Sequence, residues 1–248
     1  MLSLAACQME REPDEGAKDT TQLPDSLYDG PLSTNDTAFV RTDRPINADF
    51  VLLADVCPDI IQEIRYYTTF NFVGRRIPGY NHPEAYLTRV AADSLSAVCR
   101  ELMTLGYRLK VFDAYRPQQA VDYFVRWGKD MDDQLMKPYF YPDCPKSELF
   151  RRGYLAHKSG HSRGSTVDVT LFSMQTEREV DMGGTYDLLG SVSHFDYTNG
   201  LSDQQIANRH LLRQVMSRHG FKPIQCEWWH FTLRNEPYPN TYFTAPIP

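Results

Sequence analysis

The sequence contains no apolar run that approaches the length of a membrane-spanning helix, so no such helix is expected. It also has no basic stripe. Its 26 basic residues stand against 32 acidic ones, and nucleic acid is therefore not an expected partner. The five cysteines include no CxxC pair, the spacing typical of structural zinc sites, which argues against a site of that type. What remains is a chain of 248 residues that can bury one sizeable core.

The negative charge is concentrated in one N-terminal stretch. Residues 8–46 hold nine acidic and four basic side chains, which accounts for −5 of the formal net charge of −6. This stretch is polar and nearly without apolar periodicity, a composition that cannot repay the entropy of ordering. We therefore expect an acidic flexible linker over residues 8–47, followed by one folded domain over residues 48–248.

The first seven residues end in a short motif. Leu4-Ala5-Ala6-Cys7 resembles a bacterial lipobox, at which a lipoprotein signal is cleaved and the cysteine is acylated. The basic and long apolar regions that usually precede a lipobox are missing. We expect residues 1–7 to be the remnant of a lipoprotein signal with a lipid anchor on Cys7, which places the protein outside the cytoplasm. If the motif is a coincidence, the protein is cytoplasmic.

A histidine and an aspartate that suit a metal ion lie in the run SGHSRGSTVD at residues 159–168. A polar, glycine-punctuated turn carries His161 and leads into an alternating strand over residues 166–171, which carries Asp168. The valines and leucine of that strand take its other face, as a half-buried strand requires. Burying a carboxylate among β-branched neighbours is costly unless it is paired or binds a metal. The alternative is a hydrogen-bonded core histidine.

A second motif, EWWH at residues 227–230, has similar chemistry. Residues 230–233 alternate as a strand, with His230 and Thr232 on one face. Glu227 lies three residues before His230, and on an unbroken strand it would point to the opposite face. A bend or bulge is therefore expected if Glu227 reaches the same site. The alternative interpretations are a solvated charge for Glu227 and core packing for the two tryptophans.

These side chains together fit the requirements of a catalytic zinc ion. Such an ion takes three protein ligands and keeps a fourth position for water, which it acidifies toward neutral pH. His161, Asp168 and His230 supply the ligands, and Glu227 supplies a base for the proton of the water. We predict a zinc hydrolase with one Zn²⁺ per chain, although these ligands do not exclude other divalent ions.

Further blocks follow in a fixed order along the chain. They are RYYT at 65–68, NFVG at 71–74, GY at 79–80, DAYRP at 113–117, and DMGG at 181–184 followed by Asp187. With the two motifs above, they cover roughly residues 50–235 and resemble the zinc D-alanyl-D-alanine dipeptidases of peptidase family M15. That family includes the dipeptidase of vancomycin resistance. The resemblance implies hydrolysis of D-Ala-D-Ala to two D-alanines, in cell-wall precursor or turnover metabolism.

The resemblance also implies roles for residues outside the metal ligands. Glu227 acts as general base and acid, and Arg116 stabilises the oxyanion of the tetrahedral intermediate, as suits a rigid and permanently charged guanidinium. Asp187 binds the free ammonium of the substrate, and Ser159 helps to hold its carboxylate. Gly160 stands where a serine is expected in close relatives, which leaves the fine substrate preference open.

The periodicity predicts an α+β fold. Helices are expected over residues 93–106, 117–127 and 203–219, with Gly128 closing the second, and strands over 107–112, 166–171 and 230–233. Residues 131–150 read as a long connection that borders the site. The resemblance implies a central, largely antiparallel sheet flanked by helices, in the zinc fold shared by D-Ala-D-Ala peptidases and the hedgehog signalling domain.

Two other functions stay open. The first is a D,D-carboxypeptidase or peptidoglycan endopeptidase on the same scaffold, against which Asp187 argues because those substrates have no free amine at that place. The second is a non-catalytic, zinc-stabilised binding module. Glu227 and Arg116 argue against the module, since metal binding alone requires neither of them.

The cysteines outside the lipobox add little at this stage. Cys226, beside Glu227, reads more readily as a small apolar residue than as a nucleophile. Outside the cytoplasm, Cys57, Cys99, Cys144 and Cys226 could form disulfides, but the sequence does not give the pairing.

Overall fold

The computed structural model describes residues 49–248, which form a six-stranded sheet, a two-stranded sheet and surrounding helices. The strands are β1 (Phe50–Leu52), β2 (Ile61–Gln62), β3 (Tyr86–Thr88), β4 (Tyr107–Asp113), β5 (Thr166–Ser173), β6 (Arg178–Glu179), β7 (Phe221–Ile224) and β8 (Glu227–Leu233). The α-helices are α1 (Leu53–Val56), α2 (Arg89–Thr104), α3 (Gln118–Lys129), α4 (Lys137–Phe140) and α5 (Asp203–Arg218). Short 3₁₀ helices are η2 (Arg65–Tyr67), η3 (Lys146–Glu148), η4 (Gly160–Arg163) and η5 (Ser191–Ser193). The predicted α+β class is confirmed.

The larger sheet places the two sequence motifs on neighbouring strands. Its order is β2-β4-β5-β8-β7, and β6 pairs with β5. Strands β2 and β4 are parallel, and the other pairs of this sheet are antiparallel. In the pairing of β5 with β8, Asp168 lies directly opposite His230. A shift of register near the end of β4 also brings Asp113 opposite Asp168.

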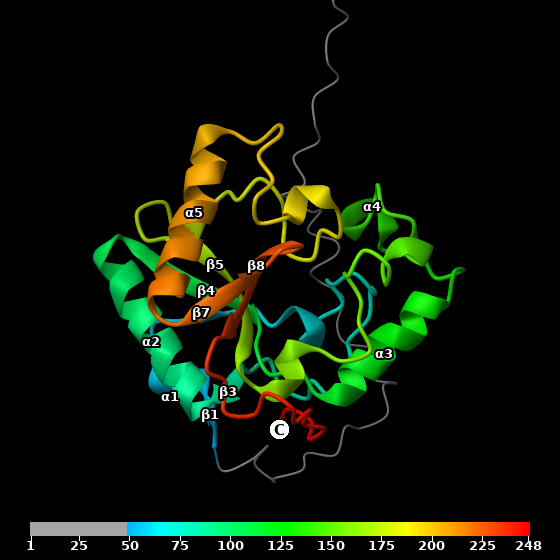
Figure 1. The fold of residues 1–248 in the computed structure, drawn as a ribbon, viewed down its shortest axis with the longest axis horizontal. Coiled ribbons are helices and arrows are strands. Elements are labelled where there is room, and N and C mark those ends of the chain that lie inside the picture. The colour runs from blue at the N-terminus through cyan, green and yellow to red at the C-terminus, as the bar shows by residue number, and fades with distance from the viewer. Residues whose placement is uncertain (1–48) are drawn as a thin grey trace, which may run out of the picture.

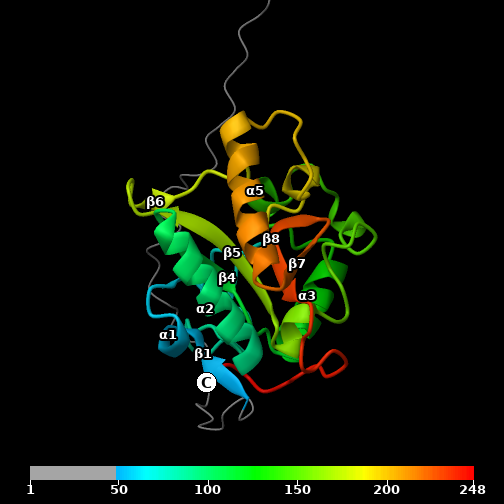
Figure 2. The ribbon, with the colours of Figure 1, turned by 60° about the vertical axis from the view of Figure 1, so that its left-hand side comes forward.

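Helices cover the sheet on both sides (Figures 1 and 2). On one side, α2 and α5 lie side by side, and on the other lie α3 and α4. Helix α2 buries Ala91, Leu95, Val98 and Leu102, whose spacing of three or four residues forms one apolar face. Helix α5 begins at a capping box: the side chain of Ser202 accepts a hydrogen bond from the amide of Gln205, and the side chain of Gln205 accepts one from the amide of Ser202. The predicted site residues line a cavity together with Val121 and Phe124 of α3, so the site lies on the α3 side of the sheet.

Two predicted helix boundaries were wrong. Helix α2 begins at Arg89, four residues before the predicted start, directly after β3. Helix α3 does not end at Gly128 but passes through it to Lys129. A Cβ at Gly128 would lie 2.7 Å from the side chain of Leu155 and 2.9 Å from that of Phe150. Gly128 thus permits close packing inside a helix and does not terminate it.

Strand β5 is also more buried than the alternating pattern predicts. Residues 166–171 are buried on both faces, so the expected half-buried strand was wrong. The side chain of Asp168 is buried among the residues of the predicted site, beside His161 and His230. A polar side chain on a strand covered on both faces needs a partner or a ligand.

The N-terminal predictions concern residues that the structure does not describe. The expected lipoprotein signal at residues 1–7 and the linker at residues 8–47 lie outside the described residues. Among residues 49–248, no helix has both the length and the apolar character needed to cross a membrane.

Candidate active site

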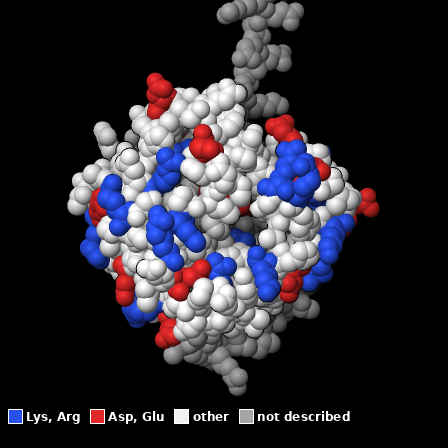
Figure 3. Space-filling view, viewed as in Figure 1, with Lys and Arg blue, Asp and Glu red and all other residues white. Residues whose placement is uncertain are grey.

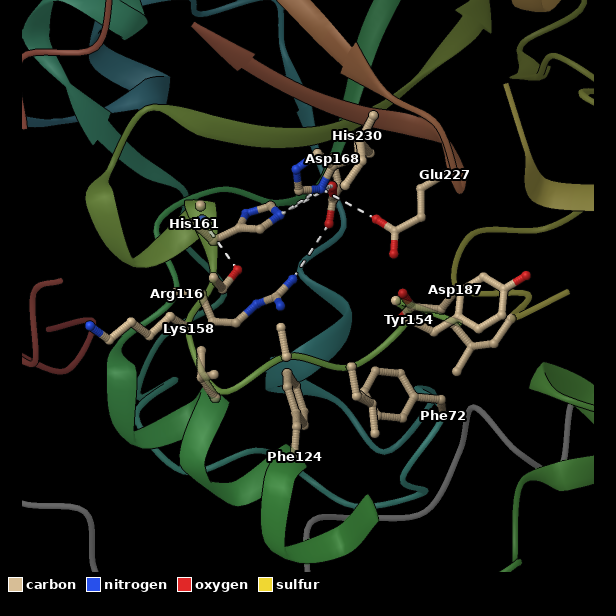
Figure 4. A pocket seen from close by; sticks show the side chains of 18 of the residues that line it. Phe72, Arg116, Phe124, Tyr154, Lys158, His161, Asp168, Asp187, Glu227 and His230 are labelled. Carbon is tan, nitrogen blue, oxygen red and sulfur yellow. Dashed lines mark hydrogen bonds and ion pairs between the residues drawn. The ribbon is translucent and has the colours of Figure 1, made fainter. Parts of the chain in front are cut away.

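Three potential metal ligands converge where η4, β5 and β8 meet (Figure 4). Nε2 of His161 lies 3.2 Å from Nδ1 of His230. Oδ1 of Asp168 lies 3.2 Å from Nε2 of His161 and 3.1 Å from Nδ1 of His230. The three predicted ligands are therefore brought together, and each contributes one donor atom to a nearly equilateral triangle.

The triangle fits a small tetrahedral metal ion. Bonds of 2.0–2.1 Å to a tetrahedral zinc ion separate neighbouring ligand atoms by about 3.3 Å, close to the spacing found here. Nδ1 of His161 lies 2.7 Å from the carbonyl of Ala114, so this nitrogen donates and leaves the lone pair on Nε2. Two imidazoles and one carboxylate also form a donor set that zinc accepts readily.

The electrostatics of the cluster favour a positive charge at its centre. Burial raises the pKa of Asp168, but the two imidazoles outweigh burial and hold that pKa below its ordinary value. Burial lowers the pKa of His230, but the carboxylates of Asp168 and Glu227 outweigh it and raise the pKa to about 9. The site thus attracts a cation, whether a proton or a metal ion.

Glu227 reaches this cluster through an irregularity in β8. In the pairing of β7 with β8, Pro223 lies opposite Phe231 whereas Ile224 lies opposite Glu227, so the register shifts between the two pairs. The shift turns the carboxylate toward His230, and Oε2 of Glu227 lies 3.3 Å from Nδ1 of His230. The predicted bend or bulge at Glu227 is confirmed.

Arg116 lies below the cluster and is held from several sides (Figure 4). Its Nε donates to Oδ2 of Asp113 at 2.8 Å, and its Nη2 lies 3.6 Å from Oδ2 of Asp168. The guanidinium stacks over the ring of Tyr66 at 5.0 Å, and the backbone amide of Arg116 donates to the carbonyl of His161. These contacts fix the guanidinium beside the predicted ligands, as an oxyanion-stabilising group requires.

Asp187 occupies a different wall of the same cavity. It is 5 % exposed, and its Oδ2 accepts a hydrogen bond from the hydroxyl of Tyr66 at 2.9 Å. Burial, with the negative charge of Asp168, raises the pKa of Asp187 well above its ordinary value, and Arg116 opposes the rise. Its backbone φ is +61°, a conformation that non-glycine residues rarely adopt. A buried carboxylate held this way suits a cationic ligand group.

Ser159 also lines the cavity, at the start of η4. Its hydroxyl oxygen accepts a hydrogen bond from the backbone amide of His161 at 3.3 Å, which caps the short helix. The hydroxyl proton remains available to a ligand. At the next position, a Cβ on Gly160 would lie 2.7 Å from Oγ1 of Thr166, so a larger residue there requires local rearrangement.

All seven predicted site residues line one small cavity of about 150 Å³. Figure 3 shows the hollow near the middle of the face viewed there. Sites for drug-sized ligands usually have roughly 300–1,000 Å³, so this cavity suits a smaller molecule. Its apolar walls come from α3, from the segment after η3 and from the loops around them. They include Phe72, Val121, Phe124, Tyr154, Leu155 and Leu189.

The predicted border of the site by residues 131–150 was wrong. None of these residues lines the cavity, and the wall is formed by residues 153–161, which follow them. Residues 131–150 instead hold α4 and η3, and the ring of Phe140 packs against that of Phe70.

Several supporting residues had no predicted role. The hydroxyl of Tyr186 lies 3.1 Å from Oδ2 of Asp168 and 3.2 Å from the hydroxyl of Tyr66. Tyr80 donates to Oδ1 of Asp113 at 2.7 Å and so supports the partner of Arg116. Three of these residues lie within the resemblance blocks, and Tyr186 is adjacent to Asp187. Their contacts join residues far apart in sequence, and no local pattern signals such contacts.

Comparisons with known proteins identify the family to which the chain belongs. A family model described as D-ala-D-ala dipeptidase, of peptidase family M15, matches residues 46–248. A D-alanyl-D-alanine dipeptidase of Streptomyces coelicolor is 39% identical over 202 residues, which cover 82% of this chain and 100% of that protein. A protein of the same name from Enterococcus faecium is 37% identical over 80% of this chain and 98% of its own length. Another from Escherichia coli is 31% identical over 75% of this chain and 84% of its own length. The chain belongs to the D-Ala-D-Ala dipeptidase family of peptidases.

Proposed function

We propose that this protein is a zinc-dependent dipeptidase that hydrolyses D-alanyl-D-alanine to two molecules of D-alanine. The proposal rests on one observation. A single small cavity is lined by the triangle of potential metal ligands, by a carboxylate beside it and by a separate buried carboxylate. The names of the relatives support the same substrate.

One Zn²⁺ per chain would be held by His161, Asp168 and His230. A bound zinc ion supplies Lewis acidity, which polarises a carbonyl group and acidifies water. Glu227 accepts the proton of the attacking water and passes it to the nitrogen of the leaving amine. Arg116 donates to the oxygen that becomes negative as the carbonyl carbon turns tetrahedral.

The remaining polar groups of the cavity would select the substrate. Asp187 pairs with the free ammonium of the dipeptide, and the hydroxyl of Tyr66 holds that carboxylate in place. Ser159 donates to the carboxylate at the other end of the substrate. A ligand without the ammonium leaves Asp187 buried without a cationic partner, which penalises capped or longer peptides.

D-alanine release from free D-Ala-D-Ala and from its N-acetylated form, measured with zinc-loaded protein, tests the proposal. We expect release from the free dipeptide alone. Release from the acetylated form would instead support the D,D-carboxypeptidase or endopeptidase. Release from neither would support the zinc-stabilised binding module.

We further infer the wider setting of the enzyme. The proposed fold is a central, largely antiparallel sheet flanked by helices, of the zinc type shared with the hedgehog signalling domain; the antiparallel pairing of β4 with β5, β5 with β8 and β7 with β8 supports the sheet. The proposed organisation is a lipid anchor at Cys7, a linker over residues 8–47 and a dipeptidase domain over residues 48–248. A tethered, extracytoplasmic enzyme would recover D-alanine from wall turnover, whereas a cytoplasmic one would deplete wall precursor. Fractionation of the native cell tests this, because recovery only in the soluble cytosol would contradict the anchor.

A further inference from the structure

Tyr154 lines the cavity but has no part in the proposed reaction. Its side chain is buried, and its hydroxyl is hydrogen-bonded to Nε2 of His194 at 3.2 Å. In Figure 4, Tyr154 lies with Asp187 at one end of the cavity, while Lys158, the neighbour of Ser159 in the sequence, lies at the other. The ring of Tyr154 therefore borders the end of the cavity that holds Asp187.

The backbone that carries Tyr154 is fixed from two directions. The amides of Tyr154 and Leu155 both donate to the carbonyl of Leu149, at 3.0 and 3.2 Å. The side chain of Leu155 packs so closely on α3 that a Cβ at Gly128 would lie 2.7 Å from it. The start of the wall over residues 153–161 is thus held against the helix, in packing too dense to yield easily to a ligand.

His194, the partner of the Tyr154 hydroxyl, is itself held in place. Its carbonyl accepts a hydrogen bond from Nη1 of Arg209 at 3.3 Å, and the next amide, that of Phe195, donates to the carbonyl of Gln225 at 3.1 Å. Burial raises the pKa of Tyr154 to about 12, so its hydroxyl stays protonated and uncharged at neutral pH. The Tyr154 side chain is therefore held at its backbone and at its hydroxyl.

We infer that Tyr154 is a specificity-determining residue, whose ring, held by His194, restricts the first residue of the dipeptide to a small side chain. The inference rests on the proposed function, in which the ammonium of that first residue pairs with Asp187. The side chain of the same residue branches from the carbon that bears the ammonium, so it lies at the same end of the cavity. There the ring occupies the space that a larger side chain would need, in a cavity of only about 150 Å³.

The rigidity of this wall converts its position into selectivity. A methyl group fits against the ring, whereas a larger side chain has to displace the ring from its packing and from His194. Selectivity of this kind comes from a clash with the wrong substrate and needs no additional contact with the right one.

A comparison of three dipeptides tests the inference: D-Ala-D-Ala, D-Phe-D-Ala and D-Ala-D-Phe, each hydrolysed by the zinc-loaded full chain and by its Tyr154→Ala variant. We expect kcat/KM for D-Phe-D-Ala, relative to D-Ala-D-Ala, to rise roughly 10- to 100-fold in the variant, because the phenyl group fills the space that the ring leaves. The relative kcat/KM for D-Ala-D-Phe should change much less, since its phenyl group lies at the end near Ser159.

Two further variants control for folding and for the substitution itself. Tyr154→Leu keeps an apolar side chain in the wall but removes the ring, and it should shift the preference in the same direction as alanine. Tyr139→Ala makes the same substitution at an exposed tyrosine of α4 that does not line the cavity, and it should keep the wild-type ratio. Each ratio is measured on one preparation and is therefore independent of the fraction of active protein.

The outcomes separate this inference from the function on which it rests. An unchanged ratio in both Tyr154 variants, or a rise confined to D-Ala-D-Phe, would overturn the role of Tyr154 while leaving the dipeptidase intact. A wild-type protein that cleaves none of the three dipeptides would contradict the proposed function, and the inference with it.

Discussion

At the scale of single residues, Asp168 is the side chain on which the interactions of the site converge. One carboxylate oxygen faces both imidazoles, and the other lies near Arg116 and the hydroxyl of Tyr186. The carboxylate is 2 % exposed and therefore depends on these partners for its stability as a charge. Its loss would leave cations and a hydroxyl without their acceptor as well as removing a metal ligand.

Glu227→Gln removes the proposed proton acceptor while keeping the size of the side chain. We expect turnover to fall by roughly 10²- to 10⁴-fold, the usual contribution of a general base. Metal content, measured on the purified variant, should stay at one ion per chain because Glu227 is not among the ligands. The neighbouring Cys226→Ala provides the matched control and should keep full turnover. Full turnover of the glutamine variant with metal bound would contradict the assigned mechanism.

Asp187→Asn tests recognition of the substrate's ammonium. Losing a charge-assisted hydrogen bond costs about 1.5–3 kcal/mol, so kcat/KM for free D-Ala-D-Ala should fall about 10- to 100-fold. The pKa of Asp187 is raised, chiefly by burial, and only the ionised form pairs with an ammonium. As pH falls through this raised pKa, the carboxylate becomes protonated and kcat/KM should decrease.

The pH profile separates this role from a structural one. In the asparagine variant the acidic decrease assigned to Asp187 should disappear, because the amide does not titrate. An unchanged acidic limb would assign that limb to another group and contradict the proposed role of Asp187.

At the scale of elements, helix α5 holds the segment that carries Asp187. Nε of Arg209 donates to the carbonyl of Met182 at 2.6 Å, and Nη1 donates to the carbonyl of Val192 at 2.9 Å. Asn208 donates to the carbonyl of Asp181 at 2.8 Å. These bonds fix both ends of the segment from 181 to 192, and the uncommon backbone conformation of Asp187 is therefore supported by α5.

Arg209→Met should loosen this segment without touching the metal ligands. We expect KM for the free dipeptide to rise about tenfold, with kcat and metal content changed much less, because only the position of Asp187 is affected. Arg218→Gln, which breaks an exposed ion pair of the same helix with Glu101, is the control and should change neither constant. Equal losses of kcat and metal in the Arg209 variant would indicate general unfolding instead.

A second element-scale feature is the C-terminal segment, which ties the two sides of the site together. The amide of Phe243 donates to the carbonyl of Ser162 at 2.8 Å, and the amide of Gln118 donates to the carbonyl of Phe243 at 3.0 Å. The hydroxyl of Tyr115 donates to the carbonyl of Ala245. The turn bearing His161 and the start of α3 are thus joined through residues that no sequence motif marks.

The sequence predicted which residues meet in the cavity better than it predicted the contacts that support them, for a physical reason. His161, Asp168, Glu227 and His230 lie in compact motifs whose chemistry can be recognised locally, and even the bulge at Glu227 follows from strand geometry. Three other features depend on which distant segments come into contact: the burial of both faces of β5, the packing at Gly128 and the border of the cavity. A local sequence pattern does not specify those contacts.

At the scale of the whole molecule, metal removal should affect activity and stability together. A chelator is expected to abolish dipeptide hydrolysis and to lower the melting temperature, because the ligand triangle exists only in the folded chain. Added zinc should restore both, which calorimetry and a D-alanine assay measure. An apoprotein with undiminished turnover would contradict the metal-dependent mechanism.

The pairing of Asp168 with His230 across β5 and β8 has a consequence for how the protein assembles. The two residues are 62 positions apart in sequence, and a slip of one residue between the strands would turn one of them to the opposite face. A folding intermediate with mispaired strands would therefore lack tight metal binding. Late in folding, the ion would therefore stabilise only those chains whose sheet has formed in the correct register.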